Sequence, residues 1–482
     1  MEKPSLASSS HVQPQQFGSA QNIAKASARR SRLPGRFARL PELAGPGFLP
    51  LGLFARLPLA MLTVGTLTLV TSVSQSYAIG GMAAGAVGIG SAVGAPVLGS
   101  LADRAGQRVV LLVAAVVNTL AVAGLLAAAY VTPGYESALA ATGVLVAAFL
   151  AGASCPQVGP MARVRWMALT TRNLLPARAP QSVGAPQPTN APDSVGVPFP
   201  VSGSRSVAAN RADLDTALSY EGTADEITFV LGPALVGVLA SLLAPWLPLA
   251  LAALMTITLV PAFAVHPSHH AVVPPAPKAG TGVVSSEKGG RQRSRRAGAV
   301  VAVPVAAMVC MGTFFGATQN ALSAYAAQYA TAELAGLLYS VMGLSSAVAA
   351  LSVAFWPQRF GLAARWVAAA LAMSMLSLLL LVPAGIWPMV FVLLLLGIPV
   401  GPVMVTVFSI GGLVAPAGRM ATVMTALASG IVAGTALGAY FAGQLAETQG
   451  PAAAFLVSMA AAAGLLVLGL VTSVVMKRRP RA

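Results

Sequence analysis

The chain has 482 residues, of which 56% are hydrophobic and only 9% are charged. A soluble protein of this length cannot cover its surface with so few charges, so lipid must solvate most of the chain. The net charge of +16 would suit a nucleic-acid-binding protein, but long uncharged segments separate the basic clusters. Composition therefore excludes a soluble globular protein, argues against a nucleic-acid partner and points to the lipid bilayer.

The two ends of the chain are polar and basic. Residues 1–45 are rich in Ser, Gln, Pro and Arg, and we expect a disordered cytoplasmic tail there. The first apolar run begins too late for a secretory signal peptide, although an organelle transit segment stays open as an alternative. A shorter basic cytoplasmic tail is expected over 477–482.

Twelve apolar runs are close to the length of about 20 residues that a membrane-spanning helix needs. The first six lie near 52–72, 78–102, 109–131, 137–158, 226–244 and 249–265, and the second six near 299–325, 332–356, 366–383, 387–410, 420–445 and 452–476. Backbone groups in lipid must be satisfied within each segment, which requires helices. We predict an all-α integral membrane protein with 12 transmembrane helices in two pseudo-symmetric six-helix bundles, at 46–267 and 298–476.

The positions of the basic residues test this count. Of the 29 Lys and Arg residues, only Arg56 falls inside a predicted span, and the others lie in the tails or in alternate loops. Because basic loops stay in the cytoplasm, the pattern predicts a multi-pass protein of the cell membrane with both termini cytoplasmic. The tryptophans, Trp166 among them, fall at or near predicted helix ends, as in an interfacial belt.

Two of the predicted cytoplasmic loops are long. Residues 167–222 are rich in Pro, Ser and Ala, and we expect a mobile insertion there. Residues 268–297 contain adjacent prolines and several arginines, which suits a linker between two bundles. Cys155 and Cys310 each lie within an apolar run, where small core residues are expected rather than a disulfide or a metal site.

The two halves carry matching segments. Residues 88–94 resemble residues 343–349, and the Val-Gly-Pro that ends at Pro160 recurs in the tenth run, where it ends at Pro402. Such duplication is typical of transporters built from repeated bundles. The two prolines are expected to loosen the fourth and tenth helices, where rocking helices must bend.

The segment 99–108 joins the second and third runs and has the pattern G-x-L-A-D-R-x-G-x-R. It resembles the loop between the second and third helices of major facilitator superfamily transporters, with drug and sugar efflux branches closest. The resemblance implies a 12-helix fold, alternating access, and a latch between the bundles in the outward-facing state. The alternative is an ordinary basic turn. The latch residues are expected to be Gly99, Asp103, Arg104, Gly106 and Arg108.

The residue types in this segment suit a latch. Gly99 permits a close approach of two helices, and Gly106 permits a sharp turn. Asp103 can lie at the N-terminal end of a helix in the other half, such as one starting near Met420, where an anion is favoured. In the copy at 355–365, Gln358 stands opposite Asp103, so we expect an acidic latch in the N-terminal half alone.

The fifth run contains the sequence G-P-A-L-V-G at 232–237. It resembles the motif G-P-x-x-G-G of antiporter branches of the superfamily, although Val236 replaces the first of the paired glycines. The resemblance implies export and a helix that flexes at Gly232, Pro233 and Gly237. The alternative is packing of small residues between membrane helices.

Two carboxylates open the fifth run. Either Asp225 or Glu226 is a candidate to carry a coupling proton. Thr223 and Glu226 also fit a capping box, which would satisfy the first backbone donors of a helix that begins here. Arg56 either snorkels to the cytoplasmic face or pairs with one of the two carboxylates, if the first and fifth helices pack together.

In the superfamily, the first, fourth, seventh and tenth helices line the substrate cavity. Polar side chains in these helices are costly in lipid, so they are expected to face the cavity or to bond another helix. The substrate-contact candidates are Thr66, Gln157, Gln319, Asn320 and Thr406. The mid-helix arginine of many proton-coupled relatives is expected to be missing from the fourth helix, because Arg163 and Arg165 lie beyond Pro160, near the cytoplasmic end.

These features favour a secondary active transporter that exports a small solute by proton-coupled alternating access. Uptake by a solute:proton symporter of the same fold is the nearest alternative. A non-transporting membrane sensor is a weaker one, because the tails and loops look too short for a signalling domain. No residue cluster suits an enzyme, and we expect no cofactor, no metal and a monomer. The expected partners are a small-molecule substrate, protons and the lipid bilayer.

Overall fold

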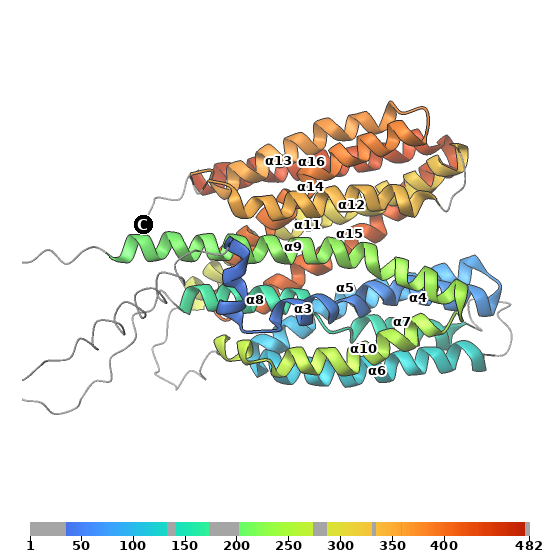
Figure 1. Cartoon of the computed structure of the whole chain (residues 1–482), viewed down its shortest axis with the longest axis horizontal. Helices are drawn as coiled ribbons and strands as arrows, with labels where there is room; N and C mark the ends of the chain where they lie inside the picture. Colours follow the sequence, from blue (N-terminus) through green and yellow to red (C-terminus); the bar gives the residue numbers. More distant parts are fainter. Residues whose placement is uncertain are drawn as a thin grey trace, which may run out of the picture.

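The computed structural model describes residues 35–132, 141–172, 202–272, 287–329, 334–357 and 359–477, which are helical apart from short turns. Twelve helical segments within these ranges are long and apolar enough to cross a membrane, which confirms the predicted count and the all-α fold. Figure 1 shows them as two bundles of roughly parallel helices that lie side by side.

The N-terminal bundle contains the first six spans. Its elements are η1 (Arg36–Arg39), α2 (Leu40–Ala44), α3 (Phe48–Phe54), α4 (Leu57–Ser74), α5 (Tyr77–Ala105), α6 (Gln107–Val131), α7 (Thr142–Ala153), α8 (Val158–Arg172), α9 (Ser202–Leu242), α10 (Leu247–Val265) and η2 (Pro267–Ala271). Two of these spans consist of two helices each. A short turn at Arg56 separates α3 from α4, and residues 154–157 separate α7 from α8.

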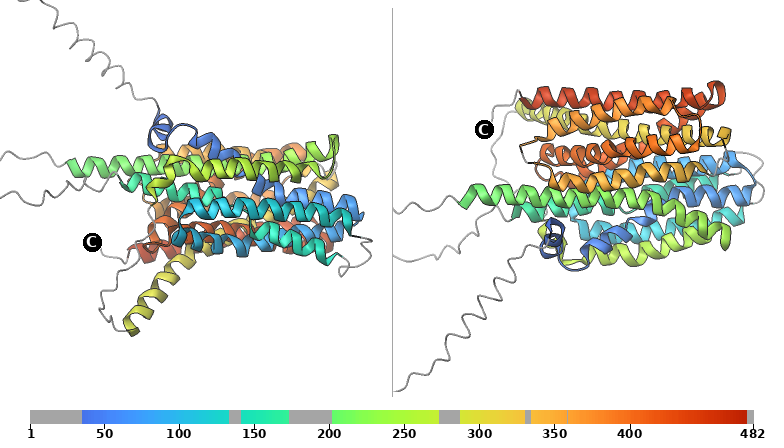
Figure 2. Two further views of the ribbon diagram at one scale, coloured as in Figure 1. Left: turned by 90° about the horizontal axis from the view of Figure 1, so that it is seen from below. Right: turned by 45° about the horizontal axis from the view of Figure 1, so that its top comes forward.

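The C-terminal bundle contains the other six spans. Its elements are α11 (Glu287–Tyr329), α12 (Leu334–Ser352), η3 (Val353–Phe355), α13 (Leu362–Ser377), η4 (Leu378–Leu381), α14 (Ile386–Val414), α15 (Met420–Gln449) and α16 (Pro451–Lys477). The Val-Gly-Pro that ends at Pro402 lies inside the continuous α14, whereas its counterpart begins α8 after a break. Figure 2 shows α9, in green, running along the boundary with the C-terminal bundle.

Several segments predicted to be polar loops or tails are partly helical. The predicted insertion at 167–222 is helical at both ends, because α8 continues to Arg172 and α9 begins at Ser202. The predicted linker at 268–297 includes most of η2 and the start of α11, and the predicted tail at 1–45 includes η1 and α2. The remaining parts of these segments lie outside the described residues.

The predicted capping box at Thr223 is wrong. Thr223 and Glu226 lie well inside α9, where backbone N–H groups already bond within the helix. The Thr223 hydroxyl instead donates to the carbonyl oxygens of Ser219, at 3.1 Å, and Ala347, at 2.9 Å. The second of these bonds crosses to α12 of the other bundle.

Glycines allow helices of one bundle to approach closely. A Cβ on Gly312 or Gly316 of α11 would collide with backbone carbonyl groups of α15, and a Cβ on Gly434 or Gly438 of α15 would collide with those of α11. In each helix the two glycines are four residues apart and therefore share one face. This close backbone packing is the kind that holds membrane helices together.

Large apolar side chains cover the outer faces of both bundles. Leu120, Leu344 and Trp387 are 67%, 68% and 82% exposed, respectively. In water such surfaces would drive aggregation, whereas in lipid they are solvated. The exposed residues therefore agree with a multi-pass membrane protein.

We expect Gly434→Ala to destabilise the protein. The added methyl group has no space beside the carbonyl oxygen of Val309, so α11 and α15 must separate, at a cost of about 1–3 kcal/mol. Gly124→Ala is the matched control, because a Cβ there meets nothing within 4 Å and alanine favours a helix. The midpoint of thermal unfolding in detergent should fall for the first variant alone. An unchanged midpoint for Gly434→Ala would contradict the close packing.

Candidate functional site

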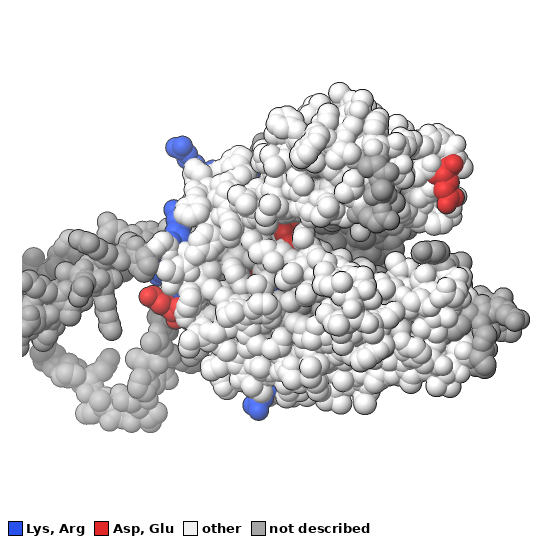
Figure 3. All heavy atoms as spheres, turned by 45° about the vertical axis from the view of Figure 1, so that its right-hand side comes forward, with Lys and Arg blue, Asp and Glu red and all other residues white. Residues whose placement is uncertain are grey.

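The two bundles meet along a seam that is closed at one end. This end holds the turns with Arg104, Arg359 and Arg419, and we name it the basic end. Figure 3 shows Lys and Arg gathered there, whereas the surface between the bundles is hollowed toward the opposite end. An acidic side chain is visible at the base of the hollow.

Asp103 joins the bundles at the basic end. Its Oδ1 accepts a hydrogen bond from the backbone N–H of Ala421 at 2.9 Å. Its Oδ2 accepts from the backbone N–H of Thr422 at 2.8 Å and from the Thr422 hydroxyl at 2.6 Å. Because α15 begins at Met420, these N–H groups have no partner within the helix, and the helix dipole favours an anion beside them.

The remaining residues of the 99–108 turn place Asp103. Gly106 has a φ of 86°, which turns the chain sharply between α5 and α6. Gly99 lies so close to Thr425 of α15 that no Cβ would fit. Arg104 and Arg108 are exposed, so they lie beside the seam and not within it.

The second copy of this turn, at 355–365, also contacts the other bundle. Here the turn supplies a positive side chain to the contact, whereas the turn at 99–108 supplies a negative one. Arg365, in the first turn of α13, pairs with Asp215 of α9 at 3.3 Å. It also donates to the carbonyl oxygens of Phe360, at 2.6 Å, and Pro357, at 3.2 Å. An arginine therefore bridges the bundles in this half, where the aligned Gln358 lies outside the described residues.

Close packing fills the seam between these two contacts. A Cβ on Gly222 of α9 would lie only 2.7 Å from a methyl carbon of Val405 in α14. A Cβ on Gly412 of α14 would lie 2.3 Å from the terminal methyl carbon of Met167 in α8, so this flexible side chain would have to move. The absence of side chains at these two positions lets the bundles touch.

A cluster of four charged side chains lies inside the N-terminal bundle. Arg56 pairs with Glu221 of α9 at 2.6 Å and with Asp225 at 2.8 Å. Arg163 of α8 pairs with the second carboxylate oxygen of Asp225 at 2.6 Å. Trp166 donates its indole N–H to Glu221 at 2.9 Å. The two positive and two negative charges balance, as burial in an apolar environment requires.

Arg56 does not snorkel to the surface. It is only 5% exposed, and its Nε donates to the carbonyl oxygen of Gly52 at 2.9 Å. Of the two carboxylates considered from the sequence, it pairs with Asp225 and not with Glu226. Its second partner, Glu221, lies one turn earlier in α9 and was not among the sequence candidates.

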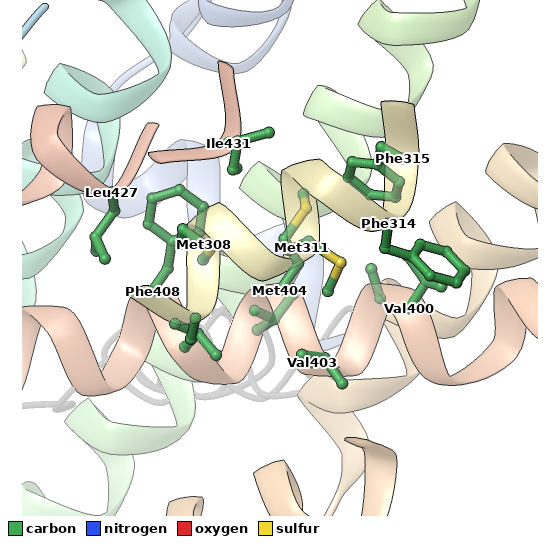
Figure 4. Packing of buried hydrophobic residues seen from close by; sticks show 14 of the residues in the cluster. Met308, Met311, Phe314, Phe315, Val400, Val403, Met404, Phe408, Leu427 and Ile431 are labelled. Atoms are coloured by element: carbon green, nitrogen blue, oxygen red, sulfur yellow. The ribbon is translucent and has the colours of Figure 1, made fainter. Parts of the chain in front are cut away.

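Arg163 lies inside the fourth span, which continues past its predicted end at 158, but it lies in the last third of the span and not at its middle. The span runs from Thr142 to Thr171. Besides pairing with Asp225, Arg163 places its guanidinium carbon 3.9 Å from the centre of the Phe408 ring in α14. Figure 4 shows Phe408 among the buried apolar side chains of the C-terminal bundle. One arginine therefore touches both the charge cluster and the opposite bundle.

Glu226 bonds to the other bundle. Its Oε1 accepts a hydrogen bond from the hydroxyl of Ser346 in α12 at 2.8 Å, and the residue is 5% exposed. In the part of the chain that the structure describes, Glu226 forms no salt bridge. Glu226 therefore differs from its neighbour Asp225, which has two arginine partners.

The five substrate-contact candidates do not form one hydrogen-bonded group. Thr66 and Thr406 are buried, and their hydroxyl groups have no hydrogen-bond partner among the described residues. Gln157 donates to the carbonyl oxygen of Cys155 at 3.0 Å, and Asn320 donates to that of Ala439 in α15 at 2.7 Å. Gln319 is exposed. Asn320 thus bonds another helix, which is the alternative to a substrate contact. The hydroxyl groups of the two threonines have no partner among the described residues.

Several important residues were missed from the sequence. Trp166 was expected in an interfacial belt, but it is fully buried and bonds the charge cluster. Glu221 lies within the segment 167–222, whose Pro, Ser and Ala content predicts a mobile loop instead of a membrane helix. A signal was available in the spacing, since Glu221 and Asp225 are four residues apart and therefore share one helix face.

The surroundings of Gly232 agree with the packing of small residues between helices as well as with the glycine–proline motif at 232–237. A Cβ there would lie 2.6 Å from the Cβ of Ala60 in α4, whereas a Cβ on Gly237 meets nothing within 4 Å. Pro233 lies inside α9, where it removes one backbone hydrogen bond. Small residues therefore bring α4 and α9 close, directly beyond the charge cluster that joins the same two helices.

Comparisons with known proteins show a family match over part of the chain and a shared fold over most of it. A sequence model of the Major Facilitator Superfamily matches residues 196–429. No match emerges among curated proteins. Among solved structures, the human organic anion transporter MFSD10 (TETRAN) is similar with a TM-score of 0.59 and 17% identity, over 91% of this chain and 100% of that one.

Two bacterial transporters are similar to a comparable degree. The E. coli fucose:proton symporter FucP has a TM-score of 0.57 and 16% identity, over 88% of this chain and 98% of that one. A bacterial homologue of the iron transporter ferroportin, in an outward-facing state, has a TM-score of 0.58 and 14% identity over the same shares. With 12 spans in two bundles, the chain has the 12-helix fold of the Major Facilitator Superfamily, and its sequence over residues 196–429 matches that family.

Proposed function

We propose that this secondary transporter is coupled to protons, and that Glu226 is the group that exchanges the proton. The observation that supports this role is the single hydroxyl donor of Glu226, which comes from the opposite bundle. A buried carboxylate without a cation beside it is costly, and uptake of a proton removes that cost. Asp225 and Glu221 are poorer candidates, because arginines already balance their charges.

We further propose that the basic end faces the cytoplasm of the cell and that both termini lie there. The support is the gathering of arginines at this end, which matches the preference of cytoplasmic loops for basic residues. In this orientation the hollow opens outward, and the seam closed by Asp103 separates it from the cytoplasm. The described conformation then corresponds to the outward-facing state of an alternating-access cycle.

Movement of the bundles then changes the contacts of two charged side chains, Glu226 and Arg163. Opening the basic end separates α9 from α12, which removes the Ser346 donor from Glu226. It also withdraws the Phe408 ring from Arg163. Protonation makes Glu226 a neutral and therefore weaker acceptor for the Ser346 hydroxyl, and a cationic solute beside the carboxylate competes with that donor, so either event weakens the closed seam. The unbonded hydroxyls of Thr66 and Thr406 are the preferred substrate contacts, because free donors favour a polar solute.

Export is the preferred direction, and uptake is the second candidate. The glycine–proline sequence at 232–237, which resembles that of antiporter branches, supports export. The structural similarity to a fucose:proton symporter supports uptake. Export coupled to inward proton flow requires opposite movements of solute and proton, whereas uptake requires parallel ones. The same vesicles tested with pH gradients of both directions separate the two.

We expect Glu226→Gln to abolish the response of solute flux to a pH gradient. Glutamine preserves the shape and accepts the Ser346 bond, but it cannot carry a proton. Purified protein in vesicles is tested with a monosaccharide, an aromatic carboxylate and an aromatic amine, and the solute that moves is used. An imposed gradient should accelerate wild-type flux severalfold and leave Glu226→Gln at its gradient-free exchange rate.

Glu447→Gln is the matched control for this experiment. Glu447 is exposed near the end of α15, far along the chain from the charge cluster, so its removal should leave the response intact. A Glu226→Gln protein that still follows the gradient would remove Glu226 from the proton path. Failure of all three solutes to move in the wild type would count against transport of these solute classes.

We expect Asp103→Asn to weaken closure of the basic end. An amide replaces a charged acceptor of three hydrogen bonds, which costs about 1–2 kcal/mol and raises the open population roughly five- to thirtyfold. Thr422→Val removes only the hydroxyl bond and should give a smaller increase. Labelling of a single cysteine placed in the seam measures the population. Equal labelling of Asp103→Asn and wild type would contradict the latch.

A further inference from the structure

The segment before the first span contacts the C-terminal bundle. The side chain of Arg36 in η1 donates to the carbonyl oxygen of Ala354, and its guanidinium carbon lies 5.5 Å from the centre of the Phe355 ring. The ring of Phe37 meets the same ring edge-on, with centroids 6.0 Å apart. Both partners belong to η3, which ends the eighth span.

The same segment is anchored to the N-terminal bundle. Arg39 pairs with Asp213 of α9 at 3.3 Å. Leu40 and Ala44 of α2 are buried, with exposed fractions of 1% and 4%. His266 bonds the carbonyl oxygen of Pro46 at 3.2 Å through Nε2. Figure 1 shows this segment, in dark blue, crossing α9 near the basic end.

We propose that residues 36–46 form a strap that holds the basic end of the seam closed, with Arg36 and Arg39 as positioning residues for the transport cycle. This inference rests on the proposed alternating access. Opening the basic end moves η3 away from α9, and the strap touches both. One set of its contacts must therefore break in every cycle.

The contacts that break are those on η3. The strap continues directly into α3 of the N-terminal bundle, and its buried leucine and alanine side chains pack there. On η3 it makes one hydrogen bond to a backbone oxygen and the ring contacts with Phe355. Arg39 acts differently, because its pair with Asp213 stays within the N-terminal bundle and holds η1 over the seam.

A charge exchange tests the strap without a transported solute. Spin labels at Ala105 and Ala417, two exposed positions on opposite sides of the basic end, report the distance across the seam in a background with Cys155→Ala and Cys310→Ala. Arg39→Asp and Asp213→Arg should each raise the separated population about two- to fivefold, as the loss of one partly exposed ion pair allows. The double variant should restore the wild-type distribution, because the pair is rebuilt with reversed charges.

A second variant addresses the contacts on η3. Arg36→Ala combined with Phe37→Ala should raise the separated population by at least as much as either charge variant, and Arg36→Lys alone should raise it less. Glu42→Gln is the control, since Glu42 is exposed in the same segment and forms no salt bridge among the described residues. Distances unchanged in all strap variants, or a double variant no better than the singles, would overturn the proposal. Distances that respond while no solute moves would instead count against the proposed transport alone.

Discussion

The cost of burying charge is the constraint on which the rest of the structure depends. Four charged side chains lie inside a membrane-spanning bundle, where each unpaired charge would cost several kcal/mol. They balance only if α4, α8 and α9 lie together, since Arg56, Arg163 and the two carboxylates come from those helices or their ends. The ion pairs therefore fix how the first, fourth and fifth spans pack. The turn before α4 places Arg56 where it reaches both Glu221 and Asp225.

Contacts within a bundle differ in kind from contacts between bundles. Within them, glycines bring backbones together, as in α11 and α15, and paired charges lock three helices. Between them, the polar contacts include the three hydrogen bonds to Asp103, the single hydrogen bond to Glu226, ring contacts of Arg163 and Arg36, and an ion pair at 3.3 Å. Bonds of the second kind form and break at small cost, because water or a solute replaces each partner. Such a distribution of contacts produces two rigid bundles, joined by a seam that can open and close.

Local chemistry determined which features could be predicted from the sequence. The 12 spans follow from hydropathy, and the position of Asp103 at the start of α15 follows from the preference of an anion for a helix N-terminus. Glu221 and Arg163 escaped prediction because a hydropathy scan treats each charge as solvated. Their partners lie far away in the chain, and only the packing of three helices reveals that the charges cancel.

In both halves, the turn at the basic end contacts the other bundle. An acidic residue makes this contact in the N-terminal half and an arginine makes it in the C-terminal half, and the lengths of the helices explain the difference. Because α15 begins at Met420, free N–H groups lie at the seam and attract Asp103. Its counterpart α9 begins at Ser202, well before the seam, so the N–H groups beside Asp215 are bonded within the helix. No backbone donors remain there for an acidic residue, and a second acid would face the carboxylate of Asp215. A contact in this half must use side chains of opposite charge, which Arg365 and Asp215 supply.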